Sequence, residues 1–176
     1  MPRTSESHPI RVDWVLPELG CTFAPGKHAA SELGDAWARD LGVDLDRLRD
    51  HWRVDLLISL VEDHELVLLG IPDLVAEASG RGIVVCRSPI VDGDVPTVAQ
   101  ACRLVDLAVE AQLAGKRAVF HCRGGLGRAG TLAACVLRNA GVGGKEAVRQ
   151  VRLARKGAIE NARQEAFVAG FQVSLP

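Results

Sequence analysis

Residues 117–131 read RAVFHCRGGLGRAGT. The first six are apolar and β-prone apart from Arg117 and His121, which predicts a strand that is buried on both faces. Four glycines fall within the next eight residues, and the apolar run from Thr131 to Leu137 predicts a helix that begins at about Gly127. The stretch therefore predicts a strand, a glycine-rich turn and a helix, which together form a unit of an α/β fold.

The same alternation of strands and helices continues along the rest of the chain. We expect strands over 11–16, 54–61 and 82–86, helices over 31–52, 96–114, 144–156 and 161–172, short helical turns over 63–69 and 71–79, and a loop over 17–30. The sequence predicts an α/β single domain over residues 11–176, with a central, mainly parallel sheet flanked by helices on both faces. Residues 1–10 are polar and show no periodicity, so we expect a flexible N-terminus.

The composition is that of a globular domain without a strongly charged surface. The 176 residues are 48% hydrophobic and 24% charged, with a net charge of −1, so we expect no nucleic-acid and no membrane partner. No apolar run reaches the ~18 residues of a membrane span, and the first residues lack the apolar centre of a signal peptide. We therefore expect a cytoplasmic protein. Five cysteines without a CxxC pair predict free thiols.

The glycine-rich turn predicts a cradle for an oxyanion. Glycines allow successive backbone N–H groups to turn toward one point, and the start of a helix adds partial positive charge there. Both the N–H groups and Arg128 favour the thiolate of Cys122, and the Arg128 guanidinium can bind two oxygens of a tetrahedral anion. The expected phosphate-binding loop consists of Arg123, Gly124, Gly125, Leu126, Gly127 and Arg128.

Two other interpretations of this turn are weaker. A tight strand-to-helix turn could hold a structural cysteine and a surface arginine, but this does not explain the order of cysteine, glycines and arginine. A dinucleotide-binding loop requires a Gly-x-Gly-x-x-Gly pattern, which residues 124–129 do not match.

The pattern His121-Cys122-x-x-Gly125-x-x-Arg128 resembles the signature of cysteine-dependent protein tyrosine and dual-specificity phosphatases. Residues 88–96, Ser-Pro-Ile-Val-Asp-Gly-Asp-Val-Pro, resemble the acid loop of the kinase-associated phosphatase (cyclin-dependent kinase inhibitor 3-like) family. The segment 54–75 is similar to the strand-and-helix segment of that family, and 157–159 and 164–167 are similar to its C-terminal helices. The resemblance implies a dual-specificity-phosphatase-like fold, with residues 11–176 as one phosphatase domain.

The resemblance also implies a mechanism. Cys122 attacks phosphorus and forms a phosphocysteine, Asp92 protonates the departing oxygen and then serves as base for water, and Arg128 holds the equatorial oxygens. No metal and no other cofactor is expected. Asp94 is the reserve candidate for the acid, and His121 is expected to hold the loop by hydrogen bonding. Gln164 is a candidate for positioning the water, with a solvent-facing helical glutamine as the alternative.

One residue departs from the family pattern. Ala129 follows the arginine, where Ser or Thr is usual, and that hydroxyl is thought to stabilise the leaving thiolate in the second step. We therefore expect slow hydrolysis of the phosphocysteine, with Thr131 as a candidate substitute for the hydroxyl.

The expected activity is a phosphomonoesterase that acts on phosphotyrosine in proteins, with phosphoserine and phosphothreonine as an open extension. The expected partner is a phosphorylated protein, and phosphate, sulfate or vanadate should be able to occupy the loop. Two alternatives stay open, namely a phosphoinositide or inositol-phosphate phosphatase and a catalytically weak phosphoprotein-binding module. A sulfurtransferase is disfavoured because its loop is typically shorter and lacks a separate acid loop.

Two further sets of residues receive a structural interpretation. The three tryptophans are expected in the core, and the helical stripe Arg149, Arg152, Arg155 and Lys156 is expected to be a solvated face.

Overall fold

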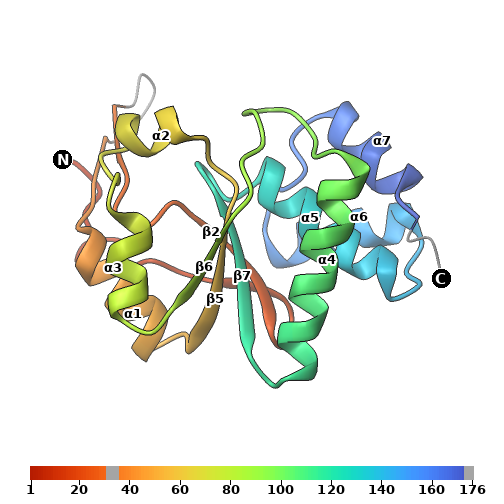
Figure 1. Ribbon diagram of the computed structural model, residues 1–176. Coiled ribbons are helices and arrows are strands. Elements are labelled where there is room, and N and C mark those ends of the chain that lie inside the picture. The colour runs from red at the N-terminus through yellow and green to blue at the C-terminus, as the bar shows by residue number, and fades with distance from the viewer. Residues whose placement is uncertain (31–35, 173–176) are drawn as a thin grey trace.

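The central sheet has five strands in the order β1-β2-β7-β5-β6 (Figure 1). The computed structural model describes residues 1–30 and 36–172. The strands are β1 (Asp13–Leu16), β2 (Leu19–Phe23), β5 (Val54–Ser59), β6 (Val84–Arg87) and β7 (Arg117–Cys122). β2, β7, β5 and β6 are parallel, and β1 pairs antiparallel with β2 at one edge. The predicted mainly parallel sheet is confirmed, with the strand over 117–122 at its centre.

Helices cover both faces of this sheet. The helices are α1 (Leu41–Asp50), α2 (Asp63–Leu68), α3 (Leu74–Gly80), α4 (Val98–Leu113), α5 (Gly127–Asn139), α6 (Gly144–Ala154) and α7 (Ala162–Gly170). Figure 1 shows α1 and α3 on one side and α4, α5, α6 and α7 on the other. A two-stranded ribbon of β3 (His28–Ala29) and β4 (Trp37–Ala38) lies outside the main sheet.

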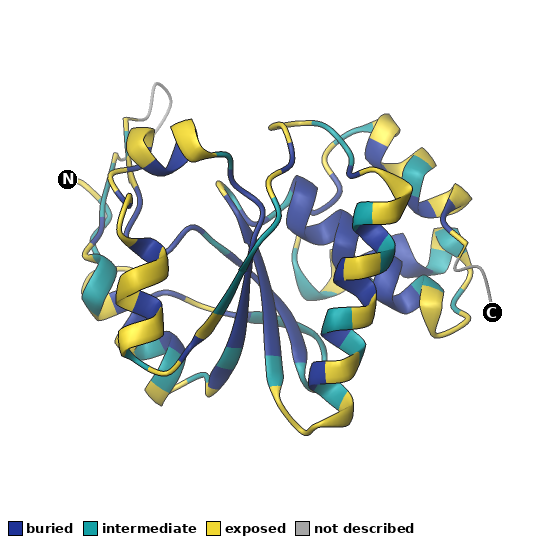
Figure 2. Cartoon of the chain, in the orientation of Figure 1, coloured by how far each residue is buried: buried dark blue, intermediate teal, exposed yellow. Residues whose placement is uncertain are grey.

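The strands contribute alternate side chains to two cores. Leu56 and Ile58 of β5 and Phe120 of β7 belong to the core on the α4–α7 side, whereas Leu57 and Val119 belong to the core on the α1 side. This alternation follows from the two-residue period of a strand. Figure 2 shows the strands buried between helices whose outer faces are exposed.

The segment expected to be a loop over 17–30 contains strand β2, so that expectation was wrong. Residues Leu19–Phe23 pair in parallel with residues 118–122 of β7. Gly20, within the expected loop, serves close packing. A Cβ at Gly20 would lie 2.4 Å from the Val12 side chain, so the close approach of these two residues requires glycine at position 20.

The predicted helical segment 31–52 is shorter in the structure. Residues 31–35 lie outside the described residues, Trp37–Ala38 form β4, and α1 begins at Leu41. The Asp40 side chain accepts a hydrogen bond from the Val43 amide at 2.8 Å and caps the helix. Trp37 precedes this cap at a helical spacing but belongs to strand β4.

Residues 1–10 pack on the domain, in contrast to the flexible N-terminus that we expected. Ile10 is fully buried, and the Ser5 hydroxyl donates to the Asp40 carbonyl at 3.2 Å. Arg3 forms an isolated β-bridge with Trp37. Composition did not reveal this packing, because it rests on individual hydrogen bonds and on one apolar side chain.

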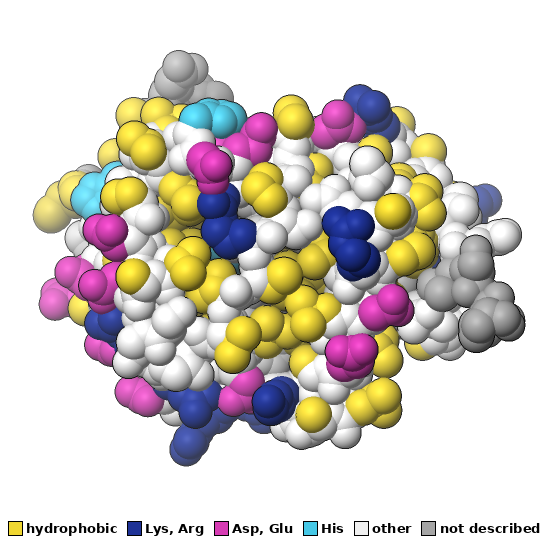
Figure 3. Space-filling view, viewed as in Figure 1, with side chains coloured by type: hydrophobic (Ala, Val, Ile, Leu, Met, Phe, Trp, Pro, Cys, Tyr) yellow, Lys and Arg dark blue, Asp and Glu magenta, His cyan; other side chains and the backbone are white. Residues whose placement is uncertain are grey.

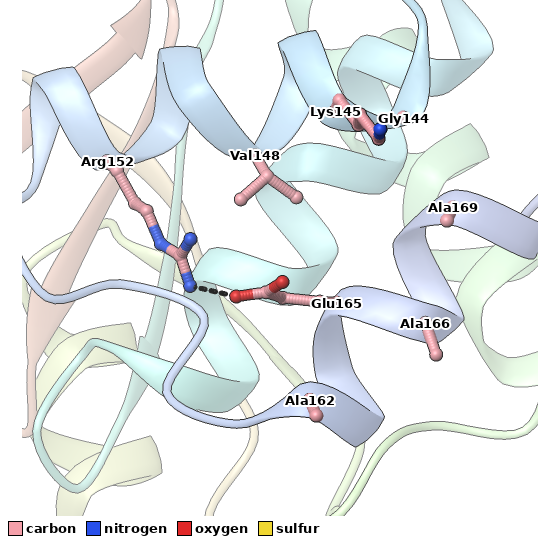
Figure 4. A pocket seen from close by; sticks show the side chains of 8 residues that line it. All are labelled: Gly144, Lys145, Val148, Arg152, Ala162, Glu165, Ala166 and Ala169. Atoms are coloured by element: carbon pink, nitrogen blue, oxygen red, sulfur yellow. Dashed lines mark hydrogen bonds and ion pairs between the residues drawn. The ribbon is translucent and has the colours of Figure 1, made fainter.

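The last two helices lie beside each other and are joined by an ion pair. Arg152 of α6 contacts Glu165 of α7 at 2.5 Å, and small residues line the hollow between the helices (Figure 4). On the face shown in Figure 3, apolar side chains gather between β6 and α4, where Val84 of the edge strand is exposed. β6 has only four residues, and such short edge strands limit edge-to-edge pairing.

A buried ion pair fixes the connection between β2 and α1. Arg39 donates to the Asp44 carboxylate from Nε and Nη2, both at 2.7 Å, and both side chains are almost fully buried. The same carboxylate accepts from the Gly26 amide at 2.8 Å. Gly26 has φ +69°, and a Cβ there would lie 2.6 Å from the Leu41 Cβ, so the turn requires glycine. The ion pair thus anchors the turn that precedes Lys27.

Removal of the Asp44 carboxylate should destabilise the domain. We expect Asp44→Ala to lower the free energy of unfolding by about 3 kcal/mol, because Arg39 and the Gly26 amide would stay buried without their partner. Asp46→Ala on the same helix removes an exposed ion pair with Arg81 and should cost under about 1 kcal/mol. Chemical denaturation measures both values. Equal effects would contradict the anchoring role.

Candidate active site

The candidate site lies at the edge of the sheet where the parallel strands end. β7 ends on Cys122, and α5 begins at Gly127 (Figure 1). The carboxyl ends of β5, β6 and β7 meet at this edge, which is where α/β proteins commonly hold ligands. A hollow of about 360 Å³ is lined there by Cys122, Asp92, Arg123 and Gly124, among others. The predicted strand, turn and helix are present, and the cysteine lines a cavity.

The carbonyl oxygens of the loop are bonded to groups around it. The Arg123 carbonyl accepts from the Ala24 amide and from Lys27 Nζ, both at 3.4 Å, and the Gly124 carbonyl accepts from Arg155 Nη2 at 2.7 Å. The Leu126 carbonyl accepts from the Gly130 amide at 3.0 Å and from the Ile159 amide at 3.3 Å. The Gly127 carbonyl accepts from the Thr131 hydroxyl at 2.8 Å. A peptide group with its carbonyl on one side has its N–H on the other. The Gly125 amide accordingly donates to Cys122 Sγ at 3.2 Å. The loop therefore has the form of a backbone anion cradle.

Gly125 is required by the shape of this cradle. Its φ is +69°, and a Cβ would lie 2.2 Å from the Thr22 carbonyl oxygen of β2. A Cβ at the neighbouring Gly124 would have no atom nearer than 3.9 Å, from Leu126. The two glycines thus differ in role, since only Gly125 has both a left-handed conformation and a backbone neighbour in contact.

Arg128 is buried, and other segments hold its guanidinium from two sides. Nη1 and Nη2 donate to the two oxygens of Glu65 at 2.6 and 2.9 Å, and Nη1 also donates to the Ile90 carbonyl at 2.9 Å. Nη2 lies 2.8 Å from the carboxylate of Asp92. Nε has no hydrogen-bond partner among the described residues. Arg128 therefore has one edge fixed by Glu65 and a second edge, formed by Nε and Nη2, on which a tetrahedral anion can bind.

Glu65 was not recognised as a site residue from the sequence. The hydrogen bonds from Arg128 outweigh the effect of burial and keep the pKa of the Glu65 carboxyl below its usual value. Its side chain also accepts from the Glu62 amide at 2.8 Å and so closes a capping box at the start of α2. In the sequence, Glu65 stands out only as a glutamate among apolar residues. Its partner Arg128 is 63 positions away.

The predicted acid loop lies against the site. Asp92 is 57% exposed at its side chain and contacts Arg128, whereas the carboxylate of Asp94 contacts Arg163 at 3.1 Å. The side chain of Asn161, at the start of α7, donates to the Gly93 carbonyl at 2.9 Å. The structure thus brings Asp92, and not the reserve candidate Asp94, to the cradle.

His121 and Gln164 are both fully buried beside the loop. Nδ1 of His121 is 3.4 Å from the Cys122 carbonyl, which can only accept, so the ring carries its proton on Nδ1. Gln164 accepts from the Glu160 amide at 2.8 Å and donates to the Asp94 carbonyl at 3.3 Å. The solvent-facing alternative for Gln164 was therefore wrong, because the side chain ties the acid loop to α7.

Ala129 and Thr131 lie on the first turn of α5, and both are buried. The Thr131 hydroxyl donates to the Gly127 carbonyl at 2.8 Å. This bond uses the one proton of the hydroxyl, so Thr131 is engaged elsewhere than at the thiol.

Three further residues near the loop were missed or misplaced. Lys27 and Glu160 line the same hollow as Cys122. Arg155 was expected on a solvated helix face, but α6 ends at Ala154, and Arg155 contacts Asp13 at 2.5 Å as well as the loop. Among the described residues, no three His, Cys, Asp or Glu side chains gather in a way that could hold a metal ion.

Substitution of Gly125 should be far more disruptive than substitution of Gly124. We expect Gly125→Ala to lower the free energy of unfolding by about 2 kcal/mol or more, because the left-handed backbone and the contact with Thr22 both oppose a side chain. Gly124→Ala has room for its methyl group and should stay within about 1 kcal/mol of the wild type. Thermal and chemical unfolding of the two variants measures these changes. Equal losses of unfolding free energy in both variants would contradict this account.

The buried imidazole of His121 should make the domain sensitive to acid. Burial, helped by the positive charges of Arg128 and Arg87, lowers its pKa from 6.5 to about 4. Because the unfolded chain takes up the proton first, this contribution is complete above pH 6.5 and is lost as pH falls toward 4. We expect a loss on the order of 3 kcal/mol across that range.

The measurement is the free energy of unfolding of the wild type and of His121→Asn at several pH values. The variant should show a shallower slope between pH 6.5 and 4.5. An unchanged slope would assign the acid sensitivity to other groups.

Sequence comparisons identify relatives among phosphatases. Residues 43–142 match the family described as "Polymorphic toxin system, DSP-PTPase phosphatase". The chain is 26% identical to human cyclin-dependent kinase inhibitor 3 over 180 residues, which cover 99% of this chain and 84% of that protein. A local match of 38% identity over 85 residues covers 48% of this chain and 18% of human dual specificity protein phosphatase CDC14C.

Solved structures agree in fold. A crystal structure of kinase associated phosphatase, with its catalytic-site cysteine substituted by serine, has a TM-score of 0.81 at 24% identity and covers 92% of this chain and 93% of that chain. The active form of Tk-PTP has a TM-score of 0.73 at 28% identity, and the match covers 88% of this chain and 91% of that chain. The chain belongs to the DSP-PTPase phosphatase family and is a cysteine-dependent dual-specificity phosphatase, related to the kinase-associated phosphatases.

Proposed function

We propose that the chain hydrolyses phosphotyrosine in proteins through a phosphocysteine on Cys122. The observation that carries the proposal is the convergence of Cys122, Arg128 and Asp92 on one cradle, with the Gly125 amide donating to the sulfur. The thiolate attacks phosphorus, while the loop amides and the Nε–Nη2 edge of Arg128 hold the equatorial oxygens. The residues of the phosphate-binding loop are Arg123, Gly124, Gly125, Leu126, Gly127 and Arg128.

Binding of a phosphoryl group competes with Asp92 for Arg128. In the structure Nη2 contacts Asp92 at 2.8 Å, on the edge that we assign to the phosphate. The incoming anion displaces the carboxylate from Arg128. Asp92, whose side chain is 57% exposed, then takes up a proton from the solvent and delivers it to the departing oxygen. Glu65 keeps its two bonds during this exchange, so the guanidinium does not have to turn.

The second step lacks the hydroxyl that the family pattern places after the arginine. Ala129 has none, and the Thr131 hydroxyl is bonded to Gly127. We therefore infer that the thiolate leaves without this hydrogen bond and that phosphocysteine hydrolysis is the slow step. In this step Asp92 accepts the proton of the attacking water, and Gln164, which contacts the acid loop, is our candidate for positioning it.

The names of the related proteins support a protein substrate. Two of them are named cyclin-dependent kinase inhibitor 3 and dual specificity protein phosphatase CDC14C. One structural neighbour, PTPMT1, was solved in complex with PI(5)P, with a TM-score of 0.72 at 21% identity. Leu126 leaves an apolar residue in the loop where an inositol-phosphate phosphatase would favour a second cation, so a phosphoinositide stays the alternative substrate.

No helix in the described part of the chain is long and apolar enough to cross a membrane. A cytoplasmic location and the absence of a nucleic-acid partner stay predictions from the sequence.

The proposal is tested by hydrolysis of para-nitrophenyl phosphate in the presence of a metal chelator. We expect turnover by the wild type, none by Cys122→Ser, and a decrease in kcat of about 100-fold or more for Asp92→Ala. Asp94→Ala is the matched control from the same loop, and its effect on kcat should be much smaller. Thermal unfolding confirms that each variant is folded.

Two outcomes would overturn parts of the proposal. A folded wild type that binds vanadate without turnover would favour a phosphoprotein-binding module. A larger loss for Asp94→Ala than for Asp92→Ala would reassign the acid.

A further inference from the structure

Three hollows meet around Trp37 at the mouth of the catalytic site. The first, of about 360 Å³, contains Cys122. The second, of about 690 Å³, is lined by Arg11, Arg155 and Lys156, and the third, of about 560 Å³, lies toward α2. Trp37 lines all three, so the expectation that it belongs to the core was incomplete. The second hollow shares Lys27 and Gly124 with the first, and the third shares Ala29 and Arg123 with it, so both adjoin the hollow of Cys122, and we refer to the three together as the groove.

Lys27 stands where the first two hollows meet, and it lines both. Only 8% of the residue is exposed, and its ammonium lies 4.2 Å from the ring centre of Trp37 and 4.9 Å from that of Phe23. The turn before it is anchored by the buried carboxylate of Asp44 through the Gly26 amide. A lysine is therefore held in place beside the catalytic thiol by a rigid, buried framework.

No carboxylate of the described residues forms an ion pair with Lys27, although Asp92 and Glu160 line the same hollow. Its ammonium makes one hydrogen bond, to the Arg123 carbonyl at 3.4 Å, and it forms no ion pair with a carboxylate of the described residues. Burial and the positive charges of Arg39, Arg123 and Arg155 lower its pKa to about 8, although the sulfur of Cys122 opposes this. The ammonium thus has hydrogen-bond donors to spare and makes no ion pair within residues 1–30 and 36–172.

Other cations line the groove beside Lys27. In the described part of the chain, Arg11, Arg123 and Lys156 also have no carboxylate partner, while Arg155 is paired with Asp13. Lys27 is the buried member of this set, whereas Arg11, Arg123 and Lys156 are exposed. Burial of a charge without a partner is costly, so the position of Lys27 is best explained by an anion that arrives with the substrate. The exposed cations add to the positive potential around it.

We propose that Lys27, with the unpaired cations beside it, forms a second anion site that selects phosphopeptides with an acidic side chain or a second phosphate next to the phosphorylated residue. This inference rests on the proposed phosphatase activity and deepens it. The phosphoryl group occupies the cradle of Cys122, and the neighbouring anion contacts Lys27. An extended peptide suits this arrangement, because it can enter the hollows that adjoin the hollow of Cys122, whereas a compact inositol polyphosphate would occupy one.

The test compares two phosphotyrosine peptides that differ only in having Glu or Gln at the flanking positions. We expect the wild type to have a kcat/KM about tenfold higher for the Glu peptide. Lys27→Met keeps the length of the side chain and its contact with the rings, and it should bring the two peptides within about twofold of each other. Lys116→Met is the matched control. Lys116 precedes the first residue of β7, at the end of the strand opposite to Cys122, so its substitution should leave the preference unchanged.

The preference should also depend on pH. Because the Lys27 ammonium loses its proton at a pKa of about 8, the preference of the wild type for the Glu peptide should be full at pH 6.5 and should decline as the pH rises past 8. The Lys27→Met variant should show no such decline. Binding of both peptides to Cys122→Ser, measured by calorimetry, reports recognition independently of turnover.

The outcomes separate the inference from the proposed function. Equal kcat/KM values for both peptides in an active wild type would overturn the second anion site and leave the phosphatase intact. If the wild type turns over no substrate, the proposed phosphatase activity is wrong. Equal binding of both peptides to Cys122→Ser would then overturn the second anion site as well. A higher kcat/KM for inositol hexakisphosphate than for the Glu peptide, lost in Lys27→Met, would overturn the peptide as the ligand.

Discussion

The geometry of the site depends on the two hydrogen bonds between Arg128 and Glu65. They join the first turn of α5 to α2 and hold a guanidinium in a buried position, where its other edge faces the cradle. A buried arginine without this partner would be strongly unfavourable, so the pair fixes both the fold around the site and the direction of the charge. Asp92 completes the arrangement from the acid loop, on the edge that an oxyanion would use.

The cradle is stabilised mainly from outside. Four elements supply donors or close contacts to the loop: β2, the segment around Lys27, the segment after α6 and the start of α5 itself. Because these groups hold the carbonyl oxygens, the amides are left for the sulfur and for an anion. The turn that carries the chemistry is therefore preorganised, and binding of phosphate requires only that Asp92 give up its contact with Arg128.

The sequence was sufficient where the signal is local. The strand over 117–122, the turn and the start of α5 depend on residues within one short stretch, and their prediction is confirmed. The acid loop followed from its resemblance to a family. Glu65, Lys27 and Arg155 could not be found in this way, because each acquires its role through a partner more than 30 positions away. The strand β2 was missed for a related reason, since Gly20 is explained by contact with Val12 and not by a turn.

The most direct test of this account is a crystal structure of the wild type with orthovanadate. We expect vanadium bonded to Cys122 Sγ, its equatorial oxygens held by the loop amides and by Nε and Nη2 of Arg128, Glu65 still paired with the guanidinium, and Asp92 released from Nη2 toward the apical oxygen. Vanadate bound away from Cys122, or an Arg128 that leaves Glu65 to reach the anion, would contradict the account.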